Sequence, residues 1–116
     1  MSLRGTRDVK DNYQLFRLTG LLDAFSEGTF RKVVGGYIEE EQSAKHIILD
    51  LSQIDFVDSS GLGALVQLVK KAQSNGATLQ VVSNARVTQT VKLVRLEKFL
   101  SLQPSVEYAI ENAKNA

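Results

Sequence analysis

Cysteine and histidine are the scarce residue types that narrow the chemistry of this 116-residue chain most. The sequence has no cysteine, so disulfides and cysteine-ligated metals are excluded, and a reducing setting is compatible. The single histidine, His46, excludes metal sites with several imidazoles, and a Ser-His-Asp triad would have to use it. Because His46 opens the apolar run Ile47-Ile48-Leu49, we expect it to begin a strand, with a structural or solvent-exposed role. We expect neither a metal nor a cofactor.

Net charge and long apolar runs are also lacking. The formal net charge of +1 leaves no broad electrostatic footprint for nucleic acid, so direct nucleic-acid binding is not expected. No apolar stretch approaches the roughly 20 residues that cross a bilayer, and the first five residues lack the apolar segment of a secretory signal. We therefore expect a cytoplasmic protein without membrane association, folded as one domain over residues 1–116.

Apolar periodicity predicts strands that alternate with helices along the chain. Strands are expected at residues 13–18, 46–51, 77–82 and 100–103, and helices after Asp23, at residues 60–74, at residues 85–97 and after Ser105. Lys10-Asp11-Asn12 is a plausible hairpin turn from a short, antiparallel N-terminal strand, and residues 53–58 are expected to form a connection. This alternation indicates an α/β fold with a mixed, mostly parallel sheet of about five strands and about four helices.

The segment Asp58-Ser59-Ser60-Gly61-Leu62-Gly63 lies where an apolar run gives way to a helical pattern. A serine at that point stands beside a helix N-terminus, which favours negative charge. Four roles are open for such a serine: a nucleophile, a phosphate ligand, a phosphorylation target, or a helix cap that accepts a backbone hydrogen bond.

Known catalytic and nucleotide-binding motifs fit this segment poorly. A hydrolase nucleophile is typically found in Gly-x-Ser-x-Gly, yet Val57 occupies the first glycine position for Ser59, and the chain's one histidine is an unpromising base. Gly61-Leu62-Gly63 supplies two glycines of a dinucleotide fingerprint, but Val66 stands at the third, and no Gly-Lys-Ser/Thr is present. The cap and the phosphorylation target are the roles that stay open.

The helix after these serines carries two apolar stripes. Leu62, Leu65, Val66 and Val69 share one face and should be buried against the sheet. A second stripe of small or apolar residues lies alongside it: Gly61, Ala64, Leu68 and Ala72. This second stripe is either a widened core face or a shallow surface that accepts a partner.

Three segments together resemble a known family: Gly20-Leu21-Leu22-Asp23, Ile48-Leu49-Asp50-Leu51 and Phe56-Val57-Asp58-Ser59-Ser60-Gly61-Leu62-Gly63. They are similar to the STAS domain of bacterial anti-sigma factor antagonists, and the resemblance extends over nearly the whole chain. The serine that directly follows the aspartate is phosphorylated in that family, and this position corresponds to Ser59. The kinase is a partner serine kinase that is also an anti-sigma factor.

The resemblance implies a binding module rather than an enzyme, held by the anti-sigma factor kinase until phosphorylation releases it and reset by a serine phosphatase. Ser60 would be the helix cap, with an exchange of the two serine roles as the alternative. The implied partner contacts are Asp23, Asp58, Ser60, Gly61, Ala64 and Leu68, although Asp23 is alternatively a helix cap. A second reading is a non-cycling scaffold or regulatory STAS domain of a larger signalling assembly or anion transporter.

Overall fold

The computed structural model describes residues 2–40 and 44–116. In these ranges five strands form one sheet in the order β1-β2-β3-β4-β5: β1 (Arg4–Val9), β2 (Tyr13–Leu22), β3 (His46–Val57), β4 (Thr78–Val82) and β5 (Leu102–Gln103). The same ranges contain four helices: α1 (Glu27–Glu39), α2 (Ser59–Ser74), α3 (Ala85–Leu93) and α4 (Val106–Lys114). Strand β1 is antiparallel to β2 and the other neighbours are parallel, which confirms the predicted mixed α/β sheet.

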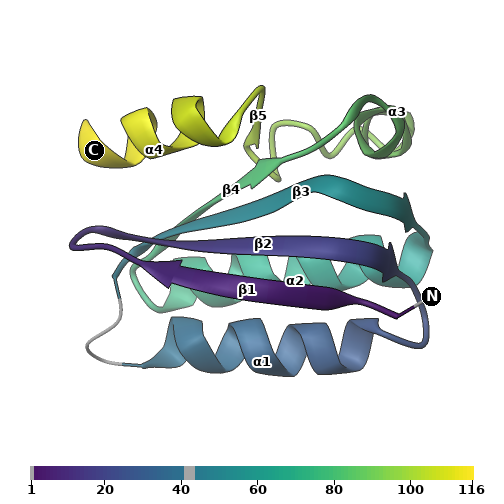
Figure 1. Cartoon of the computed structure of the whole chain (residues 1–116), viewed down its shortest axis with the longest axis horizontal. Coiled ribbons are helices and arrows are strands. Elements are labelled where there is room, and N and C mark those ends of the chain that lie inside the picture. The colour runs from purple at the N-terminus through teal and green to yellow at the C-terminus, as the bar shows by residue number, and fades with distance from the viewer. Residues whose placement is uncertain (1, 41–43) are drawn as a thin grey trace.

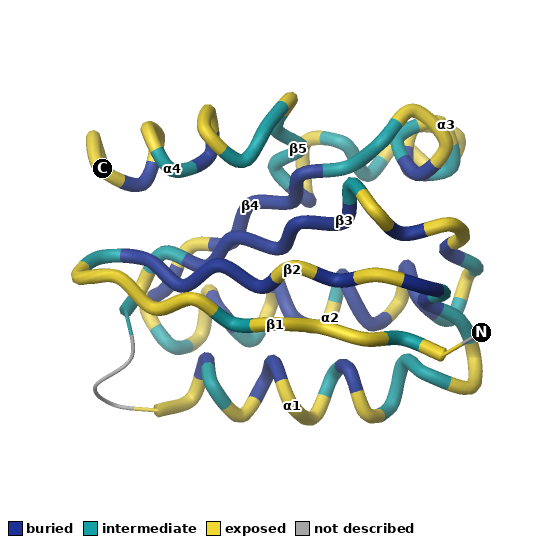
Figure 2. The backbone as a smooth tube through the Cα atoms, viewed as in Figure 1, coloured by how far each residue is buried: buried dark blue, intermediate teal, exposed yellow. Residues whose placement is uncertain are grey.

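Helices α1 and α2 lie side by side on one face of the sheet, and α4 packs against the other face (Figure 1). The larger apolar core fills the space between the sheet and the α1–α2 pair, and it extends to α3. Buried residues accordingly concentrate in the central strands and on the sheet-facing sides of the helices (Figure 2). The near-continuous apolar run at the start of β3 is explained by this burial on both faces.

Several local expectations are confirmed. The hairpin joins β1 to β2, where the Lys10 N–H donates to the Tyr13 carbonyl at 2.9 Å. The Ser105 hydroxyl accepts from the Tyr108 N–H at 3.0 Å and so caps α4 as expected. His46 begins β3, and its Nδ1 lies 2.7 Å from the Thr78 hydroxyl of β4, which places it among structural contacts between strands.

The predicted ends of β2, β3 and α3, at residues 18, 51 and 97, are wrong. Residues 53–57 continue β3 instead of forming a connection, because they pair with an equally extended β2 as far as Leu22 and Val57. The chain makes a turn after Asp23, so α1 begins only at Glu27. Helix α3 ends at Leu93 rather than at residue 97, and Arg95 adopts a left-handed backbone with φ of 58°.

Candidate functional site

Parallel strands bring the segment around the two serines next to the turn between β2 and α1. Strands β2 and β3 run parallel and stay paired to their last residues, so both carboxyl ends lie at the same edge of the sheet. The Asp58 N–H extends this pairing by donating to the Leu22 carbonyl at 3.2 Å. In Figure 1 this edge is at the right, where α2 begins and the chain turns into α1.

Asp58 is the N-cap of α2. Its backbone is extended, and its Oδ1 accepts a hydrogen bond at 2.9 Å from the N–H of Gly61, three residues later in the sequence. Its Oδ2 accepts from the Ala24 N–H at 3.3 Å, which joins the helix start to the β2–α1 turn. The expectation that Ser60 caps the helix is therefore wrong. Because Asp58 holds the cap position, both serines fall inside the first helical turn.

The two serine hydroxyls differ in exposure. Ser59 is exposed and Ser60 is half-buried, and neither hydroxyl is hydrogen-bonded to any residue in the described ranges. Within the first turn of α2 itself no side chain is acidic, and the Asp58 carboxylate at the N-cap is the negative charge that already faces the positive end of the helix dipole. Ser59 thus presents an accessible, uncommitted hydroxyl at a position that tolerates added negative charge.

Histidine-assisted catalysis at Ser59 is excluded by distance. His46 is the first residue of β3 and Ser59 follows the strand's last residue by two. The two residues thus lie at opposite ends of the twelve-residue strand β3, in a molecule whose longest extent is 32 Å, far beyond hydrogen-bond reach. Within residues 2–40 and 44–116, no group of three histidine, aspartate or glutamate side chains is arranged to hold a metal ion. None of the helices in those ranges is long and apolar enough to cross a membrane.

Asp23 closes the β2–α1 turn with hydrogen bonds of the helix-cap type. Its Oδ1 accepts from the Phe25 N–H at 3.0 Å and from the Ser26 N–H at 3.1 Å. The Ser26 hydroxyl donates to the Leu21 carbonyl at 2.8 Å, which ties the turn back to β2. Ser26 immediately precedes α1 but makes no side-chain cap bond, whereas the Asp23 carbonyl accepts from the Glu27 N–H at 2.9 Å. Asp23 therefore caps the turn that leads into α1, in line with its helix-cap alternative.

Gly61 allows the start of α2 to approach the end of β2. It is buried, and a Cβ at this position would lie 2.3 Å from the Leu22 carbonyl oxygen. A partner cannot reach a residue that is covered by its own strand. The expectation that Gly61 contacts a partner is therefore wrong, and its role is close internal packing.

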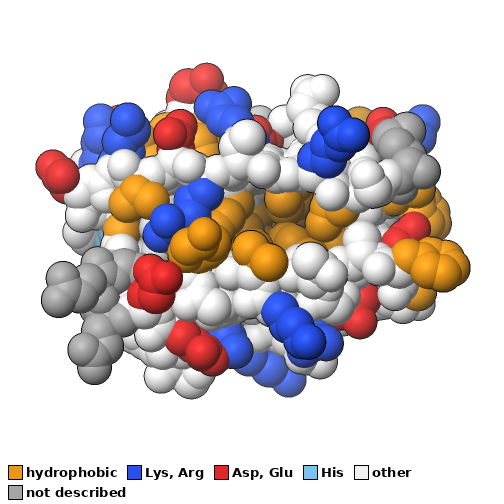
Figure 3. Space-filling model, turned by 60° about the horizontal axis from the view of Figure 1, so that its bottom comes forward, with side chains coloured by type: hydrophobic (Ala, Val, Ile, Leu, Met, Phe, Trp, Pro, Cys, Tyr) orange, Lys and Arg blue, Asp and Glu red, His pale blue; other side chains and the backbone are white. Residues whose placement is uncertain are grey.

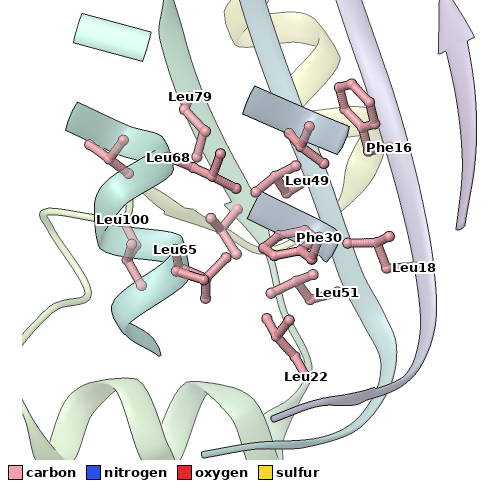
Figure 4. Close-up of a cluster of buried hydrophobic side chains, with 14 of the residues drawn as sticks. Phe16, Leu18, Leu22, Phe30, Leu49, Leu51, Leu65, Leu68, Leu79 and Leu100 are labelled. Atoms are coloured by element: carbon pink, nitrogen blue, oxygen red, sulfur yellow. The ribbon is translucent and has the colours of Figure 1, made fainter. Parts of the chain in front are cut away.

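The second stripe of α2 is a core face, which decides between the two alternatives left by the sequence. Ala64 and Ala72 are each 1% exposed and Leu68 is fully buried, because α1 packs over this side of α2. Figure 4 shows Leu65 and Leu68 pointing into the same core. The expected partner contacts at Ala64 and Leu68 are thus wrong: helical periodicity identifies an apolar stripe but not what covers it.

Phe25 is the residue at this edge that the sequence patterns do not single out. Its side chain is 97% exposed, in the β2–α1 turn beside Asp23. It lies outside the buried stripe of α1, which includes Phe30, Val34 and Ile38. The sequence signal that could have identified Phe25 is its position in a short turn. An aromatic residue there belongs to no helix or strand face that would bury it.

A separate apolar groove runs along the edge of the sheet between β1 and α1. It has a volume of about 370 Å³, and its apolar lining is Leu3, Phe16, Leu18, Phe30, Val33, Val34 and Tyr37. Figure 3 shows the hollow in this face of the molecule, with hydrophobic side chains gathered in it. Neither serine lines the groove, so it is not part of the site at the carboxyl ends of the strands.

Residues 6–109 match the family model of the STAS domain. The chain belongs to the STAS domain family. The match covers the sheet, the turn after β2 and the segment with the two serines, and it confirms the family resemblance carried by those motifs.

Two curated relatives show the range of proteins in which such a domain occurs. A putative anti-sigma factor antagonist of Thermotoga neapolitana is 29% identical over 69 residues, 59% of this chain and 61% of that protein. Solute carrier family 26 member 10 of Mus musculus is 36% identical over 75 residues, 58% of this chain and 11% of that protein. Each match therefore spans less than two thirds of the relative's length.

Solved structures share the STAS fold over nearly the whole chain. An anti-sigma factor antagonist from Mycobacterium paratuberculosis superposes with a TM-score of 0.86 at 20% identity, covering 97% of this chain and 95% of that one. The Bacillus cell fate determinant SpoIIAA in its phosphorylated form gives a TM-score of 0.71 at 18% identity, covering 94% of this chain and 98% of that one. At these identities the likeness concerns the fold.

Proposed function

We propose that this STAS domain is an anti-sigma factor antagonist that is switched by phosphorylation of Ser59. Unmodified, it binds an anti-sigma factor that is also a serine kinase; phosphorylated, it is released until a serine phosphatase resets it. The domain itself performs no catalysis and acts in the cytoplasm as a single unit over residues 1–116. The observation that carries the proposal is the exposed, unbonded Ser59 hydroxyl in the first turn of α2, held beside Asp58.

Two findings support this choice. The family match covers the motif, and one matched relative is described as a putative anti-sigma factor antagonist. The structure of a protein with the same fold, SpoIIAA, has been determined in a phosphorylated form, so this fold accommodates the modification in that protein. Ser60 is the alternative acceptor, but its half-buried position makes it the less accessible of the two hydroxyls.

Charge explains how phosphorylation switches binding without refolding. A phosphate adds about −1.5 to −2 charges, and it does so beside the carboxylates of Asp58 and Asp23, with no lysine or arginine in residues 22–26 or 57–63. The helix dipole offsets this charge within the domain. Across a close interface the phosphate must be desolvated or repelled. A penalty of about 1–3 kcal/mol weakens binding roughly 5- to 150-fold.

Asp23 and Asp58 stay in the proposed contact surface, together with the two serines. Both carboxylates are half-buried and fixed by the hydrogen bonds of the turn and the helix cap, so they offer a rigid acidic surface around Ser59. Such a surface favours a partner with complementary positive charge.

Phosphorylation of purified variants tests the site. The chain is incubated with ATP and each purified anti-sigma factor serine kinase of the source organism, and the modified residue is located by mass spectrometry. Wild type and Ser60→Ala are expected to gain one phosphate at Ser59, and Ser59→Ala is expected to gain none. Unchanged phosphorylation of Ser59→Ala overturns the site, and equal kinase affinity of wild type and Ser59→Asp overturns the switch.

A second candidate function is a non-cycling regulatory STAS domain within a larger assembly or anion transporter. The match to a solute carrier protein, of which it spans 11%, favours this reading. Absence of phosphorylation by every kinase tested, combined with a longer native chain, would support it over the first.

A further inference from the structure

Phe25 presents an aromatic ring to solvent at the edge of the molecule that carries Ser59. At 97% exposure it retains almost no contact with its own chain. A hollow beside it has further apolar lining from Leu3 and Leu21. A nearly fully exposed aromatic ring beside a partly apolar hollow is available to fill a pocket of a partner. Figure 3 shows hydrophobic atoms projecting at the end of this face where the β2–α1 turn lies.

The turn that carries Phe25 is rigid. The Phe25 N–H donates to Asp23 Oδ1 at 3.0 Å, and the Ser26 N–H donates to the same oxygen at 3.1 Å. The Ser26 hydroxyl donates to the Leu21 carbonyl at 2.8 Å. Because the backbone on both sides of Phe25 is fixed before any partner arrives, little ordering is needed when the ring is buried.

One hydrogen bond connects this turn to the serine segment. The Ala24 N–H donates to Asp58 Oδ2 at 3.3 Å. Phe25 follows the donor residue in sequence and Ser59 follows the acceptor residue, so both residues lie at the same edge of the molecule. A protein that docks at this edge to reach Ser59 has the Phe25 ring within the surface around its target.

We propose that Phe25 is the apolar anchor of the interface with the anti-sigma factor kinase. This inference rests on the proposed function and specifies the partner's chemistry: an apolar pocket for the ring, with a positively charged rim. The rim follows from charge complementarity, because the carboxylates of Asp23 and Asp58 flank the ring's turn and no basic residue occurs in residues 22–26 or 57–63. Buried aromatic anchors of this kind dominate the affinity of protein interfaces.

Calorimetric titration with the purified anti-sigma factor serine kinases of the source organism tests the anchor. Phe25→Ala is expected to weaken the affinity about 30-fold or more, which corresponds to the hot-spot threshold of about 2 kcal/mol. Phe25→Leu keeps an apolar side chain, so its affinity for the kinase is expected to lie between those of Phe25→Ala and wild type. The matched control is Tyr108→Ala, because Tyr108 is another exposed aromatic (55%) and belongs to α4, which packs on the face of the sheet opposite α1 and α2 (Figure 1). This variant should bind like wild type.

The outcomes separate this inference from the proposed function. If wild type binds a kinase and Phe25→Ala binds it equally well, the anchor is overturned while the proposed function stands. If Phe25→Ala weakens binding but Ser59 is never phosphorylated, the anchor is supported and the switch is overturned. If wild type binds none of the kinases, both are overturned. Melting temperatures of all variants are expected to match wild type, since the substituted side chains are exposed, and a lowered value for Phe25→Ala counts against the anchor.

Discussion

The Leu22 carbonyl oxygen and the Cα of Gly61 are in such close contact that a Cβ on residue 61 would lie 2.3 Å from that oxygen. This contact packs the first turn of α2 onto the last residue of β2, at the point where the Asp58 N–H donates to the same carbonyl. The position of the two serines relative to the β2–α1 turn therefore depends on a residue without a side chain.

Gly61→Ala should destabilise the domain, because either the carbonyl or the start of α2 must shift to accept the methyl group. Overpacking of this kind costs about 1–3 kcal/mol. Gly63→Ala is the matched control. Apart from its chain neighbours and its own helix backbone, no atom lies within 4 Å of a Cβ at residue 63, so the higher helix propensity of alanine should raise stability by up to about 1 kcal/mol. Urea denaturation of both variants provides the measurement, and equal free energies of unfolding would contradict the close contact.

The capping role of Asp58 makes a different prediction for the residues of the serine motif. Asp58→Ala should lower the free energy of unfolding by about 0.5–2 kcal/mol, because it removes the acceptor of the Gly61 N–H. Asp58→Asn keeps an acceptor oxygen and should be close to wild type. Ser60→Ala should change stability by less than about 0.5 kcal/mol, since its hydroxyl has no partner in residues 2–40 and 44–116. If Ser60→Ala lowered the free energy of unfolding more than Asp58→Ala does, Ser60 rather than Asp58 would be the residue that caps α2.

Leu68→Ala distinguishes a core residue from a docking residue. Full burial of Leu68 predicts a loss of about 2–5 kcal/mol in the free energy of unfolding. Gln67→Ala, an exposed neighbour on the same helix, should change little. Thermal unfolding and kinase titration are measured on the same samples. Reduced affinity of Leu68→Ala with an unchanged melting temperature would contradict the burial of this stripe.

Local sequence signals were sufficient for the alternation of strands and helices, for the Ser105 cap and for the hairpin before β2. Each of these depends on residues that are neighbours in the chain. The extension of β3 over residues 53–57 is different, because Gln53 and Asp55 interrupt its apolar pattern and only pairing with β2 makes it a strand. Backbone pairing between distant segments leaves little trace in the composition of either one.

The site shows the same division between local and tertiary causes. The acidic and hydroxyl residues of the motif were recognisable from their types and spacing. The burial of Ala64 and Leu68 depends on where α1 lies, and the exposure of Phe25 depends on the path of the turn before α1. Choosing between Asp58 and Ser60 as cap required the position at which the helix begins, which sequence signals give only to within a few residues.

Ser59→Asp should leave the fold intact. An acidic residue in the first helical turn gains about 0.3–1 kcal/mol from the helix dipole, offset in part by repulsion from Asp58, so stability should stay within about 0.5 kcal/mol of wild type. Ser74→Asp is the matched control, because it places the same charge at the last residue of α2 and also removes the Ser74 hydroxyl that donates to the Lys71 carbonyl at 3.0 Å. This control should lose about 0.3–1 kcal/mol at low salt. Urea denaturation of the two variants measures the difference. A loss above about 2 kcal/mol in Ser59→Asp would mean that its weaker partner binding reflects unfolding instead of charge at the interface.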